Sequence, residues 1–309
     1  MAVTEYSSTD ASSPVLTGQV GSFVALLDTL LVGTTGIAYG SKASVGWTKP
    51  YSATNKGVYR QPTSGANGFY LDVDDTTTSY ARVRGFEAMT APATGTNGFP
   101  LDAQLSGGGY LIKSASTDST ARPWRAISNG KILYLVISDS ETYPTFVSAR
   151  LFVFGDFTSF KSGDIYNTLI MSNHGAGSTS TYGTTMSGTL SAVHQGKYIA
   201  RNHVGTVGSI TANTLHDHAG GNGTTIMGSG GSTYPNPIDG SIQISPVRVG
   251  ESVASVIRGV LPGLWSPLHN KPLAHDDTFS GTGAMAGKTF RAINVYSAGQ
   301  LFFETSNTW

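Results

Sequence analysis

The chain has 309 residues, among them 39 glycines and no cysteine, and its 19 Lys and Arg residues balance 19 Asp and Glu residues. The charged fraction of 12% is about half the roughly 25% usual in soluble domains, and the basic residues are scattered singly, which argues against binding to nucleic acid. The lack of cysteine excludes disulfide frameworks, thiol catalysis and zinc sites built on cysteine. Because 39% of the residues are hydrophobic and 10% are aromatic, we expect a folded protein.

Apolar residues between Val20 and Leu31 recur at helical spacing and predict one short amphipathic helix, which ends at Gly33. We interpret this helix as a cap over a sheet, with docking to a partner as the alternative. No secretion signal precedes it, and the apolar stretch 23–32 is shorter than the roughly 20 residues of a membrane helix. We therefore expect folding in the cytoplasm and no membrane contact.

Beyond Gly36 the sequence changes to short β-type runs separated by Gly, Asn, Asp and Ser. The continuous apolar run 132–137 is typical of a strand covered on both faces, whereas 80–84 alternates like a half-exposed strand. The sequence therefore predicts an all-β fold with two β-rich, sandwich-like lobes, divided into residues 1–160 and 161–309.

Two segments, 172–190 and 205–236, are dominated by Gly, Ser, Thr and Asn and contain few apolar anchors. Such segments cannot bury a core by themselves. We interpret them as long insertions that are functional loops, linkers, or arms that order against neighbouring subunits.

All seven histidines lie between positions 174 and 275. In an extended stretch, His216 and His218 lie on the same face and form the best candidate for a metal site. A closed zinc site needs four ligands, however, and no second pair at a characteristic spacing is present. The alternative is that these are loop histidines bonded to the backbone. The acidic run 72–75 offers oxygen ligands for calcium, but an acidic turn between strands is the favoured interpretation.

The sequence contains no nucleophile elbow, phosphate-binding Gly-rich loop, dinucleotide fingerprint or His-Glu-x-x-His motif. Pairs of carboxylates for glycoside hydrolysis can be drawn only by elimination. We therefore expect a protein that is not an enzyme and needs no cofactor.

Aromatic residues among hydroxyl-rich loops are candidates for stacking against sugars. The residues that we select for such a carbohydrate site are Trp124, Tyr182 and Tyr234, and the wider set of aromatic candidates adds Trp47, Tyr51 and Tyr59. The alternative is that these rings are core residues or strand-pair partners.

Three segments are more distinctive than the composition. They are Ser-Thr-Asp-Ser-Thr-Ala-Arg-Pro-Trp at 116–124, Gly-Val-Leu-Pro-Gly-Leu-Trp-Ser-Pro-Leu-His at 259–269, and Phe-Glu-Thr-Ser-Asn-Thr-Trp at 303–309, with Phe-Gly-Asp at 154–156 and Ser-Gly-Asp at 162–164 between them. With these segments, the chain resembles virion structural proteins of tailed bacteriophages over most of its length.

This resemblance implies a non-enzymatic virion component that is assembled in the host bacterial cytoplasm. It would be a homo-oligomer or ring member that contacts other virion proteins, with the tail or neck preferred over capsid decoration. The alternatives are a carbohydrate-binding protein that recognises host surface glycan, and a tail enzyme that degrades polysaccharide.

The proline-rich passage around 261–272 fits such an assembly role, because its prolines fix φ and hold an extended segment in place. A loop packed on its own domain is the alternative. The residues that we expect to bind a partner are Leu261, Leu264, Trp265, Leu268 and Trp309. Trp309 either closes the fold of its own chain or fills a pocket on a neighbour.

Overall fold

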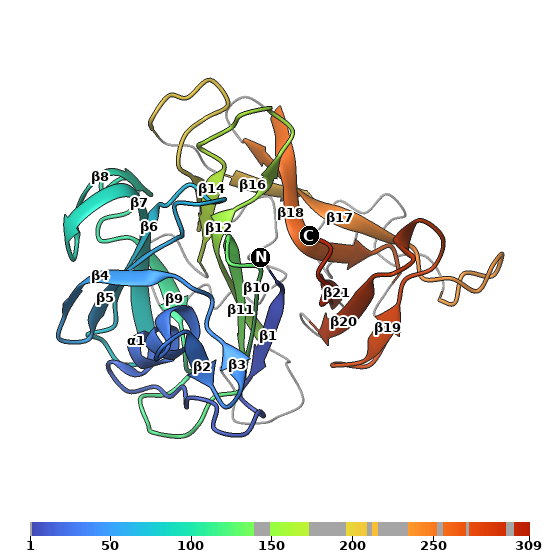
Figure 1. Ribbon diagram of the computed structural model, residues 1–309, viewed down its shortest axis with the longest axis horizontal. Helices are drawn as coiled ribbons and strands as arrows, with labels where there is room; N and C mark the ends of the chain where they lie inside the picture. Colours follow the sequence, from blue (N-terminus) through green and yellow to red (C-terminus); the bar gives the residue numbers. More distant parts are fainter. Residues whose placement is uncertain are drawn as a thin grey trace.

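A computed structural model describes the fold (Figure 1). The ranges that it describes are residues 2–138, 149–172, 196–208, 212–215, 234–251, 256–269, 272–294 and 300–309. Within them the fold is all-β with one short helical segment near the N-terminus, which confirms the predicted fold class. No helix in these ranges combines the length and apolar character needed to cross a membrane.

A six-stranded antiparallel sheet, here called the central sheet, occupies the middle of the molecule (Figure 1). In spatial order its strands are β1 (Thr4–Ser7), β10 (Trp124–Ser128), β11 (Ile132–Ser138), β12 (Ala149–Asp156), β14 (Thr168–Met171) and β15 (Lys197–Ile199). Because its strands come from positions 4 to 199, the central sheet contains strands from both sides of the predicted boundary near 160. That boundary therefore does not coincide with a division between sheets.

A second six-stranded sheet, the N-terminal sheet, lies on one side of the central sheet (Figure 1). Its strands are β4 (Thr48–Ala53), β5 (Lys56–Arg60), β6 (Tyr70–Asp74), β7 (Tyr80–Ala91), β8 (Thr94–Phe99) and β9 (Gly109–Ile112), with both β8 and β9 paired to β7. A small hairpin precedes it, formed by β2 (Ile37–Tyr39) and β3 (Lys42–Ala43). As predicted for 80–84, β7 alternates there: Ala81 and Val83 are buried, whereas Tyr80, Arg82 and Arg84 are half-buried.

A seven-stranded sheet, the C-terminal sheet, lies on the opposite side (Figure 1). Its strands are β16 (Ala212–Leu215), β17 (Ile244–Glu251), β18 (Val256–Pro267), β21 (Gln300–Glu304), β20 (Thr289–Asn294) and β19 (Thr278–Ser280), and β13 (Thr158–Ser159) pairs with β18. A short 3-10 turn, η2, spans Gly283–Met285. The two chain ends lie side by side, because the Val3 amide donates to Asn307 Oδ1 at 2.6 Å.

The central sheet is covered on both faces. Along β11, Leu133 and Leu135 belong to the core shared with the N-terminal sheet, whereas Ile132 and Tyr134 belong to the core shared with the C-terminal sheet. All seven residues of β11 are buried, which confirms the prediction from the apolar run 132–137. The architecture is therefore a stack of three sheets around a shared middle layer.

The N-terminal helical segment consists of α1 (Ser22–Leu27) followed by one π-helical turn, η1 (Asp28–Val32). Its apolar side chains are buried in the core of the N-terminal sheet, so the segment caps that core, in agreement with the first interpretation. The Asp75 carboxylate accepts the Phe23 amide at 2.8 Å and pairs with the fully buried Lys113 ammonium. Because Asp75 points inward, the acidic run 72–75 does not present all its carboxylates together.

Candidate ligand-binding pocket

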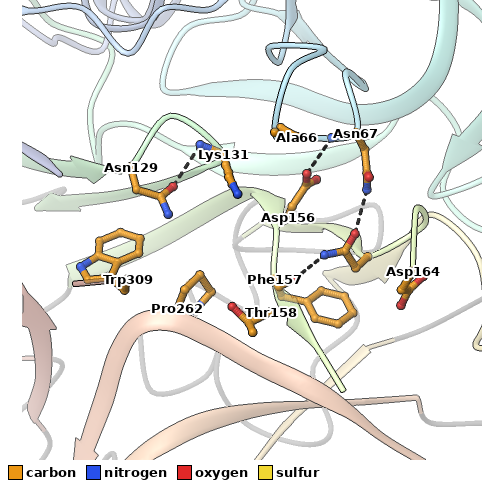
Figure 2. A pocket seen from close by; sticks show the side chains of 12 residues that line it. Ala66, Asn67, Asn129, Lys131, Asp156, Phe157, Thr158, Asp164, Pro262 and Trp309 are labelled. Atoms are coloured by element: carbon orange, nitrogen blue, oxygen red, sulfur yellow. Dashed lines mark hydrogen bonds between the residues drawn. The ribbon is translucent and has the colours of Figure 1, made fainter. Parts of the chain in front are cut away.

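A cavity of about 450 Å³ opens where the three sheets meet (Figure 2). Its walls come from the loop before β6, the turn between β10 and β11, the β12–β13 connection, the loop at 164–167, Pro262 on β18 and the last residue, Trp309. Figure 2 shows Asn129 and Lys131 on one side of the cavity, Thr158 and Pro262 on the opposite side, and Trp309 at one end. The pocket therefore depends on all three layers being packed together.

The turn Asn129–Lys131 supplies polar groups to the cavity wall. Asn129 Oδ1 accepts the backbone amides of Lys131 and Ile132 at 3.0 and 3.2 Å, which closes the turn before β11. Since the oxygen is used in this way, the Asn129 Nδ2 group is left as a donor on the cavity side. The Lys131 ammonium has no hydrogen-bond or salt-bridge partner within the described ranges.

Asp156 lies at the end of β12 and is only 7% exposed. Its carboxylate accepts the Asn67 amide at 2.8 Å, the Thr168 hydroxyl at 2.6 Å and the Gln61 amide at 3.1 Å. Burial raises the pKa of Asp156, and these hydrogen bonds together with the charge of Lys131 oppose that rise. The bonds tie the N-terminal sheet's loop to the central sheet, so Asp156 holds the pocket wall in place.

Asp164 belongs to a buried ion cluster. The Arg258 guanidinium donates to both its oxygens at 2.8 to 3.0 Å, and the Ser159 hydroxyl donates at 2.7 Å. Arg258 also contacts Glu251 at 2.5 Å, and the second oxygen of Glu251 lies 2.8 Å from His203 Nδ1. The cluster fixes the 160–166 and 201–206 loops to the C-terminal sheet.

Trp309 forms the aromatic end of the pocket. Its indole N–H donates to the Glu304 carbonyl at 2.9 Å, and its ring centroid lies 5.9 Å from that of Tyr134. Gly263 allows this packing, because it has φ +70° and a Cβ atom there would lie 2.3 Å from the Trp309 ring. Trp309 thus closes the fold of its own chain, the first of the two predicted roles.

The pocket offers both hydrogen-bond donors and hydrogen-bond acceptors. Asn67 uses its Nδ2 group on Asn167 and Thr168, at 2.9 Å each, which leaves its Oδ1 as an acceptor. The Thr158 side chain is exposed, and its hydroxyl has no hydrogen-bond partner in the part of the chain that the structure describes. Such an arrangement is suited to recognising a polar, uncharged ligand.

Comparisons with models of known protein families and with curated proteins find no match to this chain. Within the described ranges, no three His, Asp or Glu residues lie close enough to hold a metal ion. The predicted metal ligands His216 and His218 lie outside these ranges, as do Tyr182 and most of the segments 172–190 and 205–236.

Of the aromatic residues selected for a carbohydrate site, Trp124 and Tyr234 lie within the described ranges, and their surroundings differ. Trp124 is only 1% exposed, and its indole N–H donates to the Pro14 carbonyl at 3.0 Å. The prediction of Trp124 as an exposed ring is therefore wrong, because the ring is buried in the core of the N-terminal sheet, where it packs on Tyr39 of β2. Trp47 and Tyr59 are also buried, whereas Tyr234 is 40% exposed and lies beside His269.

Residues 261–267 of the segment 261–272, which we predicted to bind a partner, belong to β18, and β18 lies inside the C-terminal sheet. Leu261 and Leu264 are almost fully buried in the core shared with the central sheet, so neither side chain is available to a partner. This is a correction to the prediction, and its cause is that β18 pairs with β17, β21 and β13 of the same chain. Trp265 and Leu268 are half-buried.

Sequence reasoning missed the pocket residues Asn67, Asn129, Lys131 and Thr158. The Asn129-Gly130 dipeptide between two β-type runs is a turn signal that was available. No local pattern indicates, however, that this turn meets loops from two other sheets.

Proposed function

We propose that the protein is a non-enzymatic structural component of a tailed-phage virion, a tail or neck protein that binds neighbouring virion subunits. It assembles in the host bacterial cytoplasm. The sequence support is the resemblance carried by segments 116–124, 259–269 and 303–309. The structural support is a group of exposed apolar side chains held on a fixed scaffold.

This group, here called the apolar rim, consists of Phe160, Ile165 and Val204, which are 64%, 61% and 68% exposed. Their loops are tied together, because the Phe160 amide donates to the Arg258 carbonyl at 2.8 Å and Lys161 Nζ donates to the His203 carbonyl at 2.6 Å. Because these three large apolar side chains lie on adjoining loops that the ion cluster holds in place, they support the proposal of a surface that another protein covers. The apolar rim therefore replaces Leu261 and Leu264 in the proposal.

The pocket carboxylates favour binding over catalysis. A general acid, general base or nucleophile must aim a free oxygen at the substrate. The oxygens of Asp164 accept bonds from Arg258 and Ser159, and those of Asp156 accept three bonds from the fold's own donors. Both carboxylates thus serve to fix loops.

Immunogold electron microscopy and mass spectrometry of purified particles test the proposal. We expect label at one position on the virion, at the tail or neck. Label on the capsid would favour a decoration protein, and absence of the protein from particles would overturn the virion role.

The apolar rim is tested by the double substitution Phe160→Ser/Ile165→Ser, with Ile238→Ser as the matched control because Ile238 is 91% exposed on the loop before β17. We expect the double variant to fold normally and to be incorporated into particles at least tenfold less. The control variant should be incorporated like the original chain. Equal incorporation of all three would show that the rim makes no subunit contact.

A further inference from the structure

We propose that the cavity between the three sheets is a binding site for a neutral saccharide. This inference goes beyond the assembly role and does not depend on it. It also differs from the carbohydrate site expected from the sequence, because it uses other residues in another place. The cavity volume of about 450 Å³ is within the range of roughly 300 to 1,000 Å³ typical of small-molecule sites.

The unused polar groups of the pocket match the hydroxyl groups of a sugar ring. Lys131 Nζ and Asn129 Nδ2 are donors, Asn67 Oδ1 is an acceptor, and the Thr158 hydroxyl is both. Each sugar hydroxyl also donates and accepts, so neighbouring hydroxyls can satisfy all four groups. Figure 2 shows these side chains around one space, contributed by separate loops.

The charges around the cavity favour an uncharged ligand. The charge of Lys131 acts on the Asp156 carboxylate, and Asp164 is paired with Arg258. A ligand anion placed near Lys131 would meet the carboxylates, and a ligand cation placed near them would meet Lys131. Either charge gains little net attraction, which leaves a neutral polar molecule as the best fit.

Trp309 supplies the ring that a saccharide needs. It is half-buried, one part of it packs on Tyr134, and it borders the cavity at the end opposite Asp164 (Figure 2). An indole ring contacts the apolar C–H face of a sugar, while the amides and the ammonium bind its hydroxyls. The combination of an aromatic ring with hydrogen-bonding groups favours a saccharide over a purely polar ligand such as glycerol.

The test is a glycan array with neutral and acidic saccharides, followed by calorimetry of the intact chain with the best neutral binder. We expect Lys131→Met and Thr158→Val to weaken binding at least tenfold without lowering the melting temperature by more than a few degrees. Lys56→Met is the matched control, since Lys56 is paired with Asp74 on the N-terminal sheet, away from the pocket. Trp309→Ala should also abolish binding, but it removes core contacts and is therefore secondary evidence.

Three outcomes would overturn the inference: no neutral saccharide bound by the original chain, binding of acidic saccharides alone, or binding unchanged in Lys131→Met and Thr158→Val. Loss of binding in Tyr234→Ala, with both pocket variants unaffected, would place the sugar at the exposed Tyr234 instead. None of these results depends on whether the protein is found in particles, so the two proposals can fail separately.

Discussion

Asp72 gives the protein a specific response to pH. Burial raises the pKa of this carboxyl to about 6, the Ala93 backbone amide opposes the rise, and the charge of Asp74 adds to it. Because the folded pKa lies above the unfolded value of about 3.9, the contribution of protonated Asp72 to stability is present below pH 4 and is lost as the pH rises through 6.

We therefore expect Asp72→Asn to stabilise the protein at pH 7 by about 1 kcal/mol, after allowance for solvent screening, and to have little effect at pH 4. Urea unfolding at the two pH values measures the difference. A gain of the same size at both values would contradict the assignment to Asp72.

Gly263 controls the position of Trp309. Gly263→Ala should destabilise the protein by about 1 to 3 kcal/mol, because the added methyl group meets the indole ring and the backbone has φ +70°. Gly287→Ala is the control: Gly287 has φ +84°, but a Cβ atom there has no neighbour within 4 Å. If thermal unfolding shifts both variants equally, backbone strain alone explains the effect and the contact with Trp309 contributes nothing.

Among the secondary-structure elements, β11 contributes side chains to two hydrophobic cores, one on each of its faces. Ile132→Ala and Leu133→Ala change adjacent residues on opposite faces. Each should lower the free energy of unfolding by about 2 to 5 kcal/mol. On β7, Thr90→Ala alters an exposed position and should change the free energy of unfolding by no more than about 0.5 kcal/mol. Denaturant unfolding measures the stability of all three variants. A small loss of stability in Ile132→Ala would mean that the C-terminal sheet does not pack tightly on β11.

The elements were predictable where a local pattern carries the information. The run 132–137 indicates a strand covered on both faces, and the spacing from Val20 to Leu31 indicates the helical cap. Neither pattern identifies the covering partner. For that reason the sequence pattern could not show that Trp124 and Leu261 are buried in the core and not exposed for binding.

The candidate site was less accessible to prediction than the fold. Asn67, Lys131 and Trp309 are distant in the sequence and become neighbours only through the packing of three sheets. A lysine in a turn and a tryptophan at a chain end have many other common roles. Only the folded structure shows that these residues line the same cavity.

For the whole molecule, the shared central sheet predicts that residues 1–160 and 161–309 do not fold separately. The first fragment lacks β14 and β15 of the central sheet, and the second lacks the β11 and β12 side chains that complete its core. We expect both fragments to lack near-ultraviolet circular dichroism when made alone. Cooperative unfolding of either fragment would instead support the predicted boundary.

The meeting of the chain ends allows a rearrangement of the polypeptide. Because Val3 and Asn307 are hydrogen-bonded, a linker of a few residues can join the ends, and the chain can be opened at the exposed turn around Ala93 between β7 and β8. Such a circular permutant keeps every strand pairing while β1 follows directly after β21. The last strand of the C-terminal sheet then leads into the edge strand of the central sheet, whereas β7 and β8 are joined only by their hydrogen bonds.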